Sequence, residues 1–498
     1  MARSGYETQI REVLASRQNE TAIDFDGIPF SWGEANAVAT AVGDVLKQAG
    51  VPEYARIGLM GRNLPIHFAT LWGIFIAGCC TTMIHAFQPP EALAEDITAN
   101  RWPIVFGESR DWTAPVIAAA NAAGSVGYVF SDDPVAPFSR ITSNALPAEA
   151  LLAPSGDDTV IQLLSSGTTG KPKRITLSRK SIEELIERTR FQFASGGAGE
   201  NAAQMMPWPL SSLGGTNAAL PAVSLGQLLA IQEKYDAPRF LEQLRRHRPT
   251  FLSMPPAAVA MLLQLKPAKE DLASVQLYFN GSAPLDPNVQ TILEDEYDLP
   301  VANAYGATEF AGIISSWVPE DFALLRAKRG SCGRALPGIK MRIVSADTGA
   351  VLPPGEAGLV EALVPRIADD WVRTNDLAFM DEDGFLFLQG RADDAIMRGG
   401  FKVIPEEVVE VLRTHPKVGD AALIGIPDER LGMVPAAAVE KRFTSEAPTA
   451  EELEAFLRTR LAAYKIPVRF AIVAEIPRTE SMKPRREGLR ALFADPKS

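Results

Sequence analysis

Residues 159–175, TVIQLLSSGTTGKPKRI, are the stretch from which the fold can be inferred. The apolar run that opens it predicts a strand, and the pattern SRKSIEELIERTRF at 178–191 predicts a helix. Between them, every residue from Ser165 to Gly170 is glycine or carries a hydroxyl group. Glycine lets backbone N–H groups approach an anion closely, and hydroxyl groups add donors. The strand, loop and helix together predict an anion-binding loop, with a solvated turn as the alternative for the loop alone.

The loop differs from the Walker A pattern. Only two residues separate Gly167 from the glycine before Lys171, where Walker A has four, and Pro172 stands where Ser or Thr should bind Mg²⁺. Lys171 and Lys173 still supply positive charge. We therefore expect a phosphate-binding loop of another kind.

Helical and strand patterns alternate on both sides of this loop. Helices are predicted at 34–50, where Gly50 ends the pattern, at 91–101, and at 178–191, with Ser181 and Glu184 as a capping box; strands are predicted at 55–61 and 103–108. This alternation is typical of βα units, so we expect an α/β fold whose large N-terminal domain has mostly parallel sheets with flanking helices.

Residues 64–88 contain no Asp, Glu, Lys or Arg and are long enough to span a membrane. The segment nevertheless carries two His, two Gly, two Cys and three Thr, and CCTTMI reads as a strand after a helix that breaks at Gly78. We expect a buried helix–strand unit and no integral membrane segment.

The composition changes near residue 390. A helix that starts at Pro405, a strand at 420–427, a helix opened by the capping box Thr449/Glu452 and a strand at 469–477 follow. About a hundred residues with their own helices and strands form a plausible small α+β domain. We therefore expect domains at 1–392 and 393–498, with the boundary around 391–394.

Bulk properties exclude several classes of protein. A net charge of −12 and the absence of long Lys/Arg runs argue against a nucleic-acid partner. Three cysteines cannot form a disulfide framework, and the N-terminus has no signal-type apolar region, so a cytoplasmic protein is expected. Four scattered His residues show no metal-ligand spacing, and neither a Gly-x-Ser-x-Gly elbow nor a strand followed by Gly-x-Gly-x-x-Gly is present.

Five motifs, in order, resemble those of the acyl-adenylate-forming superfamily, which includes acyl- and aryl-CoA ligases, luciferases and peptide-synthetase adenylation domains. They are the 163–175 loop, NAYGATE at 303–309, TND at 374–376, GRADDAIMRGGFKVIPEEVV at 390–409 and IPRTESMKPRR at 476–486. The similarity of the segments at 30–50 and 68–79 extends the resemblance to nearly the full length. It implies ATP-dependent conversion of a carboxylic acid into an acyl-AMP.

The resemblance also implies roles for individual residues. Lys483 would bridge the acid and the α-phosphate, Thr308 would donate to that phosphate, and Glu309 would bind Mg²⁺. Met482 replaces the glycine that usually precedes this lysine. The nucleotide would be held by Ser165, Ser166, Gly167, Thr168, Thr169, Gly170, Lys171, Gly281, Ser282, Ala283, Asn303, Ala304, Tyr305 (stacked on adenine), Gly306, Asp376 (on the ribose) and Arg391.

The acid pocket is expected to use Trp208, Leu210, Ser211, Ser212, Gly214, Gly281 and Gly306. Peptide-synthetase relatives carry an Asp here that pairs with the substrate ammonium, whereas this sequence has PWPLSS at 207–212. An amino acid would leave its ammonium unpaired in an apolar site, so an aromatic, alicyclic or fatty acid is expected. Trp208 has a second interpretation as a core residue.

The acceptor of the acyl group is left open by the sequence. By resemblance, the small C-terminal domain is mobile and swings about Asp393, presenting first Lys483 and then Gly399, Gly400 and Lys402. The glycine pair suits a thin pantetheine arm, which favours CoA as co-substrate. The alternatives are an amine, as in stand-alone amide bond synthetases, and a non-catalytic nucleotide-binding relative. A monomer and a homodimer are both compatible with the sequence.

Overall fold

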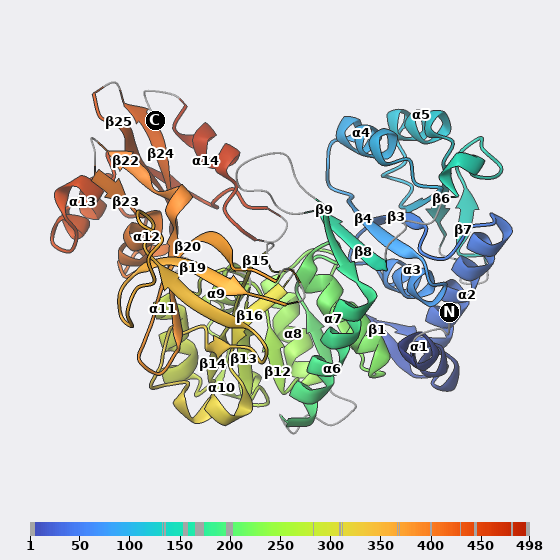
Figure 1. Cartoon of the computed structure of the whole chain (residues 1–498), viewed down its shortest axis with the longest axis horizontal. Coiled ribbons are helices and arrows are strands. Elements are labelled where there is room, and N and C mark those ends of the chain that lie inside the picture. Colours follow the sequence, from blue (N-terminus) through green and yellow to red (C-terminus); the bar gives the residue numbers. More distant parts are fainter. Residues whose placement is uncertain are drawn as a thin grey trace. The chain divides into compact units, whose positions relative to one another are not determined.

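The computed structural model describes residues 5–131, 133, 136–152, 158–164, 174–195, 203–281, 283–307, 310, 312–365, 367, 369–398, 401–428, 430–442, 446–479 and 482–494. The chain forms two compact units, Met1–Leu252 and Ser253–Ser498 (Figure 1). This division does not test the expected boundary around 391–394, which stays a prediction.

The first unit alternates helices and strands as the sequence pattern predicts. Its helices are α1 (Gly5–Ser16), α2 (Trp32–Gln48), α3 (Pro65–Ile76), α4 (Pro90–Asn100), α5 (Ala114–Ala123), α6 (Arg179–Ser195), α7 (Leu213–Ser224) and α8 (Ala237–His247). Its strands are β1 (Thr21–Phe25), β2 (Ile28–Ser31), β3 (Arg56–Gly61), β4 (Cys80–His85), β5 (Ile104–Gly107), β6 (Val126–Phe130), β7 (Phe138–Arg140), β8 (Thr159–Leu164), β9 (Arg174–Ser178), β10 (Gln204–Met206) and β11 (Leu229–Ile231), and β12 (Phe251–Ser253) lies at the unit boundary.

A seven-stranded sheet with the order β7-β6-β5-β3-β4-β8-β9 dominates this unit. The five inner strands pair in parallel, and β7 and β9 are antiparallel edge strands. Both faces are covered, as parallel sheets require. Along β3 the side chains alternate, because Leu59 packs into the cluster of α2, α3 and α7 whereas Met60 packs into the cluster of α4 and α5. The expected α/β class is confirmed.

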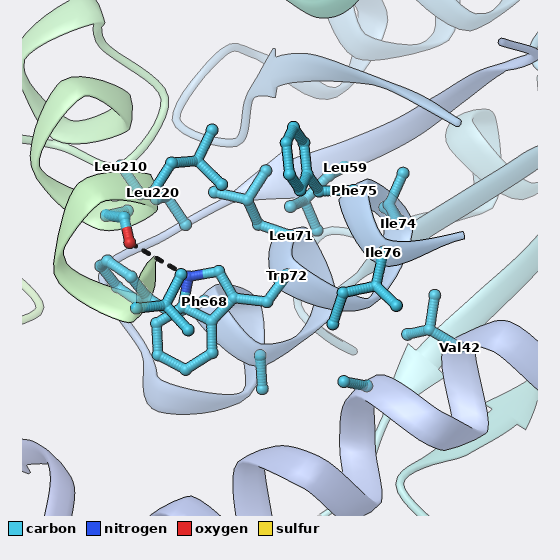
Figure 2. Close-up of a cluster of buried hydrophobic side chains, with 14 of the residues drawn as sticks. Val42, Leu59, Phe68, Leu71, Trp72, Ile74, Phe75, Ile76, Leu210 and Leu220 are labelled. Atoms are coloured by element: carbon cyan, nitrogen blue, oxygen red, sulfur yellow. Dashed lines mark hydrogen bonds between the residues drawn. The ribbon is translucent and has the colours of Figure 1, made fainter. Parts of the chain in front are cut away.

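The charge-free segment at 64–88 forms α3 and β4, and both are buried. Figure 2 shows the α3 side chains packed against apolar residues of α2, β3 and α7. The indole Nε1 of Trp72 donates to the carbonyl oxygen of Ala219 at 3.2 Å, so the ring is buried without an unpaired donor. In the part of the chain that the structure describes, no helix has the length and hydropathy of a membrane-spanning segment.

The predicted capping box of α6 is wrong. The helix begins at Arg179, so Ser181 already lies inside it, and the backbone N–H of Ser181 donates to Ser178 Oγ at 3.2 Å. Ser178 ends β9 and is equally able to cap. Both serines precede a Glu-rich helical pattern. Ser178 became the cap because β9, which pairs with β8, extends to Ser178 and the helix starts at the next residue.

The second unit contains several small sheets. Its helices are α9 (Pro256–Gln264), α10 (Lys269–Leu272), α11 (Pro287–Thr291), α12 (Pro405–Arg413), α13 (Ala450–Arg458) and α14 (Arg486–Leu492). Its strands are β13 (Leu277–Asn280), β14 (Val301–Asn303), β15 (Tyr305–Ala307), β16 (Gly312–Ser316), β17 (Arg334–Ala335), β18 (Lys340–Val344), β19 (Gly358–Leu363), β20 (Val372–Met380), β21 (Leu386–Arg391), β22 (Ile396–Arg398), β23 (Phe401–Val403), β24 (Val418–Asp428), β25 (Gly432–Lys441) and β26 (Arg469–Val473).

The C-terminal hundred residues form helices and strands close to those predicted. The long hairpin β24–β25 pairs with β22 and β26, and α12 and α13 pack on it around a shared apolar cluster. Thr449 and Glu452 make the predicted capping box of α13. Leu453 and Leu457 are fully buried, as their helical spacing predicts.

Candidate active site

Asp376 occupies the centre of a hydrogen-bonded group in the second unit. It lies on β20, directly opposite Arg391 of the antiparallel strand β21. Arg391 Nη1 donates to Asp376 Oδ1 at 3.1 Å, and the Tyr305 hydroxyl donates to Asp376 Oδ2 at 2.5 Å. The backbone N–H of Asp376 donates to Thr374 Oγ1 at 3.2 Å. These contacts fix the orientation of a carboxylate that can accept hydrogen bonds on both oxygens.

Arg391 also binds the aspartate at the expected hinge. Its Nε and Nη2 donate to the two oxygens of Asp393, each at 2.9 Å, and Asn375 Nδ2 donates to the same carboxylate at 3.5 Å. The bidentate hydrogen bonds from Arg391 hold the pKa of Asp393 below its usual value. In this conformation one guanidinium group therefore links Asp376 to Asp393.

Lys483 lies in the electrostatic field of the same group. Burial lowers the pKa of its ammonium, the positive charge of Arg391 lowers it further, and the carboxylate of Asp376 acts in the opposite direction. Lys483 belongs to the turn before α14, in which its carbonyl oxygen accepts from the Thr479 backbone N–H at 2.7 Å. The structure thus brings together three of the predicted site residues, Lys483, Asp376 and Arg391.

The backbone at the hinge is crowded. Gly390 has a φ of +121°, a conformation that side-chain-bearing residues rarely adopt. A Cβ atom at this position would lie 2.7 Å from Glu406 Oε2 of α12. Burial raises the pKa of Glu406. The positive φ therefore favours glycine at the end of β21, and a side chain here would also displace Glu406.

The predicted nucleotide-binding segments 280–283 and 303–306 start at one edge of a parallel strand pair. Strands β13 and β14 end side by side at Asn280 and Asn303. Asn280 Nδ2 donates to Asn303 Oδ1 and to the carbonyl oxygen of Ala283, both at 3.0 Å, and the N–H of Ala304 donates to the Asn280 carbonyl at 2.7 Å. These bonds hold the two segments together, with Gly281 partly exposed beside them.

Tyr305 and Gly306 follow on β15. Tyr305 is 5% exposed, and its ring belongs to an apolar cluster that includes Phe310 and Ile314. Its hydroxyl group reaches Asp376, a contact that the sequence did not indicate. At Gly306 a Cβ atom would lie 2.4 Å from the carbonyl oxygen of Gly312, so no larger residue fits. Adenine stacking by Tyr305 stays a prediction.

The expected acid-pocket residues 208–214 lie in the first unit, where Asn63 holds them. Asn63 follows β3, and its side chain donates to the carbonyl oxygen of Trp208 at 2.9 Å and accepts from the N–H of Leu210 at 2.7 Å. Trp208 is 8% exposed, and Leu210 is fully buried in the main apolar cluster. The structure thus makes Leu210 a core residue, and any contact with an acid stays a prediction.

Two serines follow in this segment. Ser211 is buried, and its Oγ lies 3.4 Å from His85 Nδ1 at the end of β4. Ser212 is the N-cap of α7, because its Oγ accepts from the N–H of Gly215 at 3.1 Å. Gly214 lies against the indole of Trp208, where a Cβ atom would come within 2.8 Å of Cδ2.

Several predicted residues lie outside the described part of the chain. They are Ser165, Ser166, Gly167, Thr168, Thr169, Gly170, Lys171, Ser282, Thr308, Glu309, Gly399 and Gly400. The backbone of Lys402 is described, on β23. Among the described residues, no three His, Cys, Asp or Glu side chains form a group that could hold a metal ion. The magnesium ligand proposed from the sequence, Glu309, is therefore untested.

Sequence reasoning missed Asn63 and His85 as neighbours of the acid-pocket segment. Asn63 lies two residues after β3 and His85 ends β4, so both are at the carboxyl ends of parallel strands, which is where open α/β sheets place binding residues. A polar residue at the end of each predicted strand was the available signal.

Comparisons with known proteins agree with this arrangement. A family model described as "AMP-binding enzyme" matches residues 10–362, and a second, "AMP-binding enzyme C-terminal domain", matches residues 407–483. A probable CoA ligase of Humulus lupulus is 27% identical, with 93% of this chain and 87% of the relative covered. An indoleacetate–CoA ligase of Aromatoleum aromaticum is also 27% identical, with 95% of each covered.

The fold is shared with solved structures. The ATP-bound MatB of Rhodopseudomonas palustris superposes with a TM-score of 0.79 at 23% sequence identity, over 98% of this chain and 99% of that one. At this identity the similarity establishes the fold, with strands and helices in the same arrangement.

Proposed function

Because the chain belongs to the AMP-binding enzyme family, we propose that it converts an aromatic, alicyclic or fatty acid into an acyl-AMP and then transfers the acyl group to CoA. The enzyme class is an ATP-dependent carboxylic acid ligase, and its relatives are acyl- and aryl-CoA ligases. To the family and the enzyme class, this proposal adds the kind of acid, the acceptor of the acyl group and the roles of individual residues.

One observation supports the first step above all, namely that Lys483 is buried within the electrostatic influence of both Asp376 and Arg391. A carboxylate attacking the α-phosphate of ATP brings two negative groups together, and the reaction is limited largely by positioning and charge neutralisation. An ammonium group at this position would attract both reactants and stabilise the charge that develops between them. Lys483 is therefore the proposed catalytic residue.

The residues around Asp376 fit a nucleoside. Its carboxylate is oriented by Arg391 and Tyr305, and 13% of the side chain remains exposed. A carboxylate accepts the paired hydroxyl groups of a ribose without a change of protonation. Gly306 is exposed and Gly281 partly exposed at the adjoining strand ends, so a planar base could approach the backbone there. Asp376 would hold the ribose, and residues 281–283 and 303–306 would hold the base.

Magnesium would accompany the ATP phosphates. Mg²⁺ is bound in such sites by one or two carboxylates together with phosphate oxygens, so a cluster of three protein carboxylates is not needed. Glu309 is the proposed ligand, and the metal would neutralise phosphate charge. The loop at 165–171 is proposed to hold the β- and γ-phosphates.

The acid is proposed to be uncharged apart from its carboxylate. The segment 205–217 contains no charged residue, and Trp208 within it is buried. An ammonium-bearing acid would lose its hydration there without gaining a counter-ion. The name of the Aromatoleum aromaticum relative, which joins a heteroaromatic acid to CoA, points to the same class.

Pyrophosphate exchange tests the first step directly. Wild-type protein is incubated with Mg²⁺, ATP, labelled pyrophosphate and benzoate, indoleacetate, 4-coumarate, cyclohexanecarboxylate or octanoate in turn. Replacing Lys483 with Ala should lower acid-dependent exchange by at least about a hundredfold, the usual scale for loss of a charged contact made in the transition state. Unchanged exchange in this variant would refute the assignment.

The acceptor is tested separately by adding CoA or a primary amine after the adenylate has formed. We expect CoA to accelerate its consumption and to yield a thioester that hydroxylamine cleaves. Faster consumption with the amine alone, with an amide as product, would identify an amide bond synthetase instead.

A further inference from the structure

Four charged side chains form a continuous row in the second unit. Arg413 Nε lies 3.7 Å from Asp286 Oδ2 and donates to Asp420 Oδ1 at 2.8 Å, and the second oxygen of Asp420 accepts from Arg478. The four side chains are only 12–21% exposed. We call Asp286, Arg413, Asp420 and Arg478 the ion-pair chain.

One end of the ion-pair chain holds the turn that carries Lys483. Arg478 Nη1 donates to the carbonyl oxygen of Met482 at 3.2 Å. Within the turn, Thr479 accepts from the Lys483 N–H through Oγ1 at 3.2 Å and donates its own N–H to the Lys483 carbonyl at 2.7 Å. Met482 has a φ of +63°, so the backbone bends at the residue whose carbonyl oxygen accepts from the guanidinium. The backbone of Lys483 thus depends on where Arg478 is held.

The other end belongs to the segment that follows the proposed base-binding loop. Asp286 comes directly after NGSAPL at 280–285 and caps the N-terminus of α11, accepting from the Asn288 N–H at 2.8 Å. The contact between Asp286 and Arg413 therefore joins the β13–α11 segment to α12 of the C-terminal hundred residues.

Burial makes these charges interdependent. Although burial opposes ionisation, Arg413 and Arg478 together keep the pKa of Asp420 below its usual value. Burial also raises the pKa of Asp286, and Arg413 counteracts that rise. Glu440 and Glu410 border the row, at Arg478 and Arg413 respectively, and the pKa of each is raised, mainly by burial. Removing a central member would leave a buried charge without its partner, so the two ends are the informative places to change.

We propose that Arg478 is a positioning residue for Lys483, and that the ion-pair chain, through the contact of Arg413 with Asp286, holds Lys483 in the arrangement required for adenylation. This inference rests on the proposed role of Lys483. It predicts that Asp286 supports the adenylation half-reaction and is dispensable for acyl transfer to CoA, because in the second half-reaction Lys483 has no proposed task.

The first test is Asp286→Asn, which keeps the shape of the side chain and the oxygen that caps α11. Exchange of pyrophosphate is measured with the acid of the panel above that reacts fastest, and acyl transfer is measured with the corresponding synthetic acyl-AMP and CoA. We expect about fivefold slower exchange, the upper range for a partly exposed ion pair, and transfer within about twofold of wild type. Asp298→Asn is the matched control, since Asp298 pairs with Arg326 on the exposed surface of the same unit.

The second test is Arg478→Met, which keeps length and removes the charge and the donors. We expect exchange to fall by at least about tenfold, the range for a lost hydrogen bond from a charged group, and Arg478→Lys to recover part of it because an ammonium can still pair with Asp420. In a Lys483→Ala background neither Arg478→Met nor Asp286→Asn should lower exchange further, because a positioning residue acts through the group that it positions.

Three results would overturn the inference. They are equal losses in both half-reactions, full additivity with Lys483→Ala, and unchanged exchange in Asp286→Asn. If Arg478→Met fails to fold, Asp286→Asn still decides the question. Unchanged exchange in Lys483→Ala would refute the proposed function itself, whereas a large loss there with normal exchange in Asp286→Asn and Arg478→Met would refute only the positioning role.

Discussion

Lys483 is a cation whose surroundings partly oppose its charge. Burial and the neighbouring Arg391 both favour the neutral amine, and only Asp376 among the named neighbours favours the ammonium. Such an environment is costly unless anionic ligands arrive to compensate it. Such a site would favour the phosphate and the carboxylate that the proposed adenylation must join.

The lowered pKa of Lys483 predicts an alkaline limit on adenylation. The ammonium is the form proposed to act, so kcat/KM for exchange should be constant below the lowered pKa and fall as the pH rises through it. This fall should occur at a lower pH than the ordinary lysine value would give. It is measured as a pH profile of acid-dependent pyrophosphate exchange.

Lys483→Arg is the control for that profile. A guanidinium group stays charged above pH 12, so the remaining activity of this variant should persist to higher pH. If kcat/KM falls at the same pH in wild type and in Lys483→Arg, the group that titrates is not Lys483.

At the scale of elements, Asn63 connects the end of β3 to the segment before α7. Its side chain bonds the carbonyl oxygen of Trp208 and the N–H of Leu210, so two backbone groups of a buried segment depend on a single amide. A parallel strand thereby sets the path of the segment proposed to line the acid pocket.

Replacing Asn63 with Ala should therefore raise KM for the acid more than KM for ATP. Each buried backbone group left unpaired costs about 1–3 kcal/mol, so the segment should shift and the free energy of unfolding should fall by that order. We expect KM for the acid to rise at least about fivefold with KM for ATP nearly constant. Steady-state kinetics and urea unfolding measure the two effects.

Asn144→Ala is the matched control for stability. Asn144 donates to the carbonyl oxygens of Asn121 and Ser125 at 3.1 and 3.0 Å, away from the 208–214 segment. It should lower stability without changing the ratio of the two KM values. An equal rise of both KM values in Asn63→Ala would contradict the proposed role of Asn63 in shaping the acid pocket.

At the scale of the whole molecule, the contacts of the second unit fit the arrangement proposed for adenylation. Arg391 binds Asp376 and Asp393 at once, and Arg486 of α14 pairs with Asp394. For acyl transfer, the proposed swing about Asp393 would have to break these contacts, because the same residues cannot present Lys483 and the 399–402 segment to one site.

Restricting the hinge should separate the two half-reactions. Asp393→Pro fixes φ near −65°, so we expect transfer from acyl-AMP to CoA to fall at least about tenfold more than pyrophosphate exchange. Rapid-quench measurement of each half-reaction checks this. Asp393→Ala removes the same carboxylate from Arg391 without fixing φ, and equal effects of the two substitutions would mean that the carboxylate, and not the hinge, matters.

Much of the fold was predictable because its signals are local. The helix over 34–50, the strand at 55–61 and the capping box of Thr449 and Glu452 follow from spacing within one or two turns of chain. The choice of Ser178 over Ser181 as the α6 cap was not predictable, since it depended on how far β9 extends along β8.

The sequence by itself determined the family and the α/β class, and it proposed the residues that would carry the chemistry, because motifs such as TND at 374–376 are contiguous stretches of recognisable residue types. Only the tertiary structure decided that Tyr305 bonds Asp376, that Asn63 bonds the 208–210 segment, and that the ion-pair chain runs from Arg478, which bonds Met482, to Asp286. The physical reason is distance along the chain. Contacts between remote residues depend on strand order, register and shared burial, and none of these leaves a pattern in a single stretch of sequence.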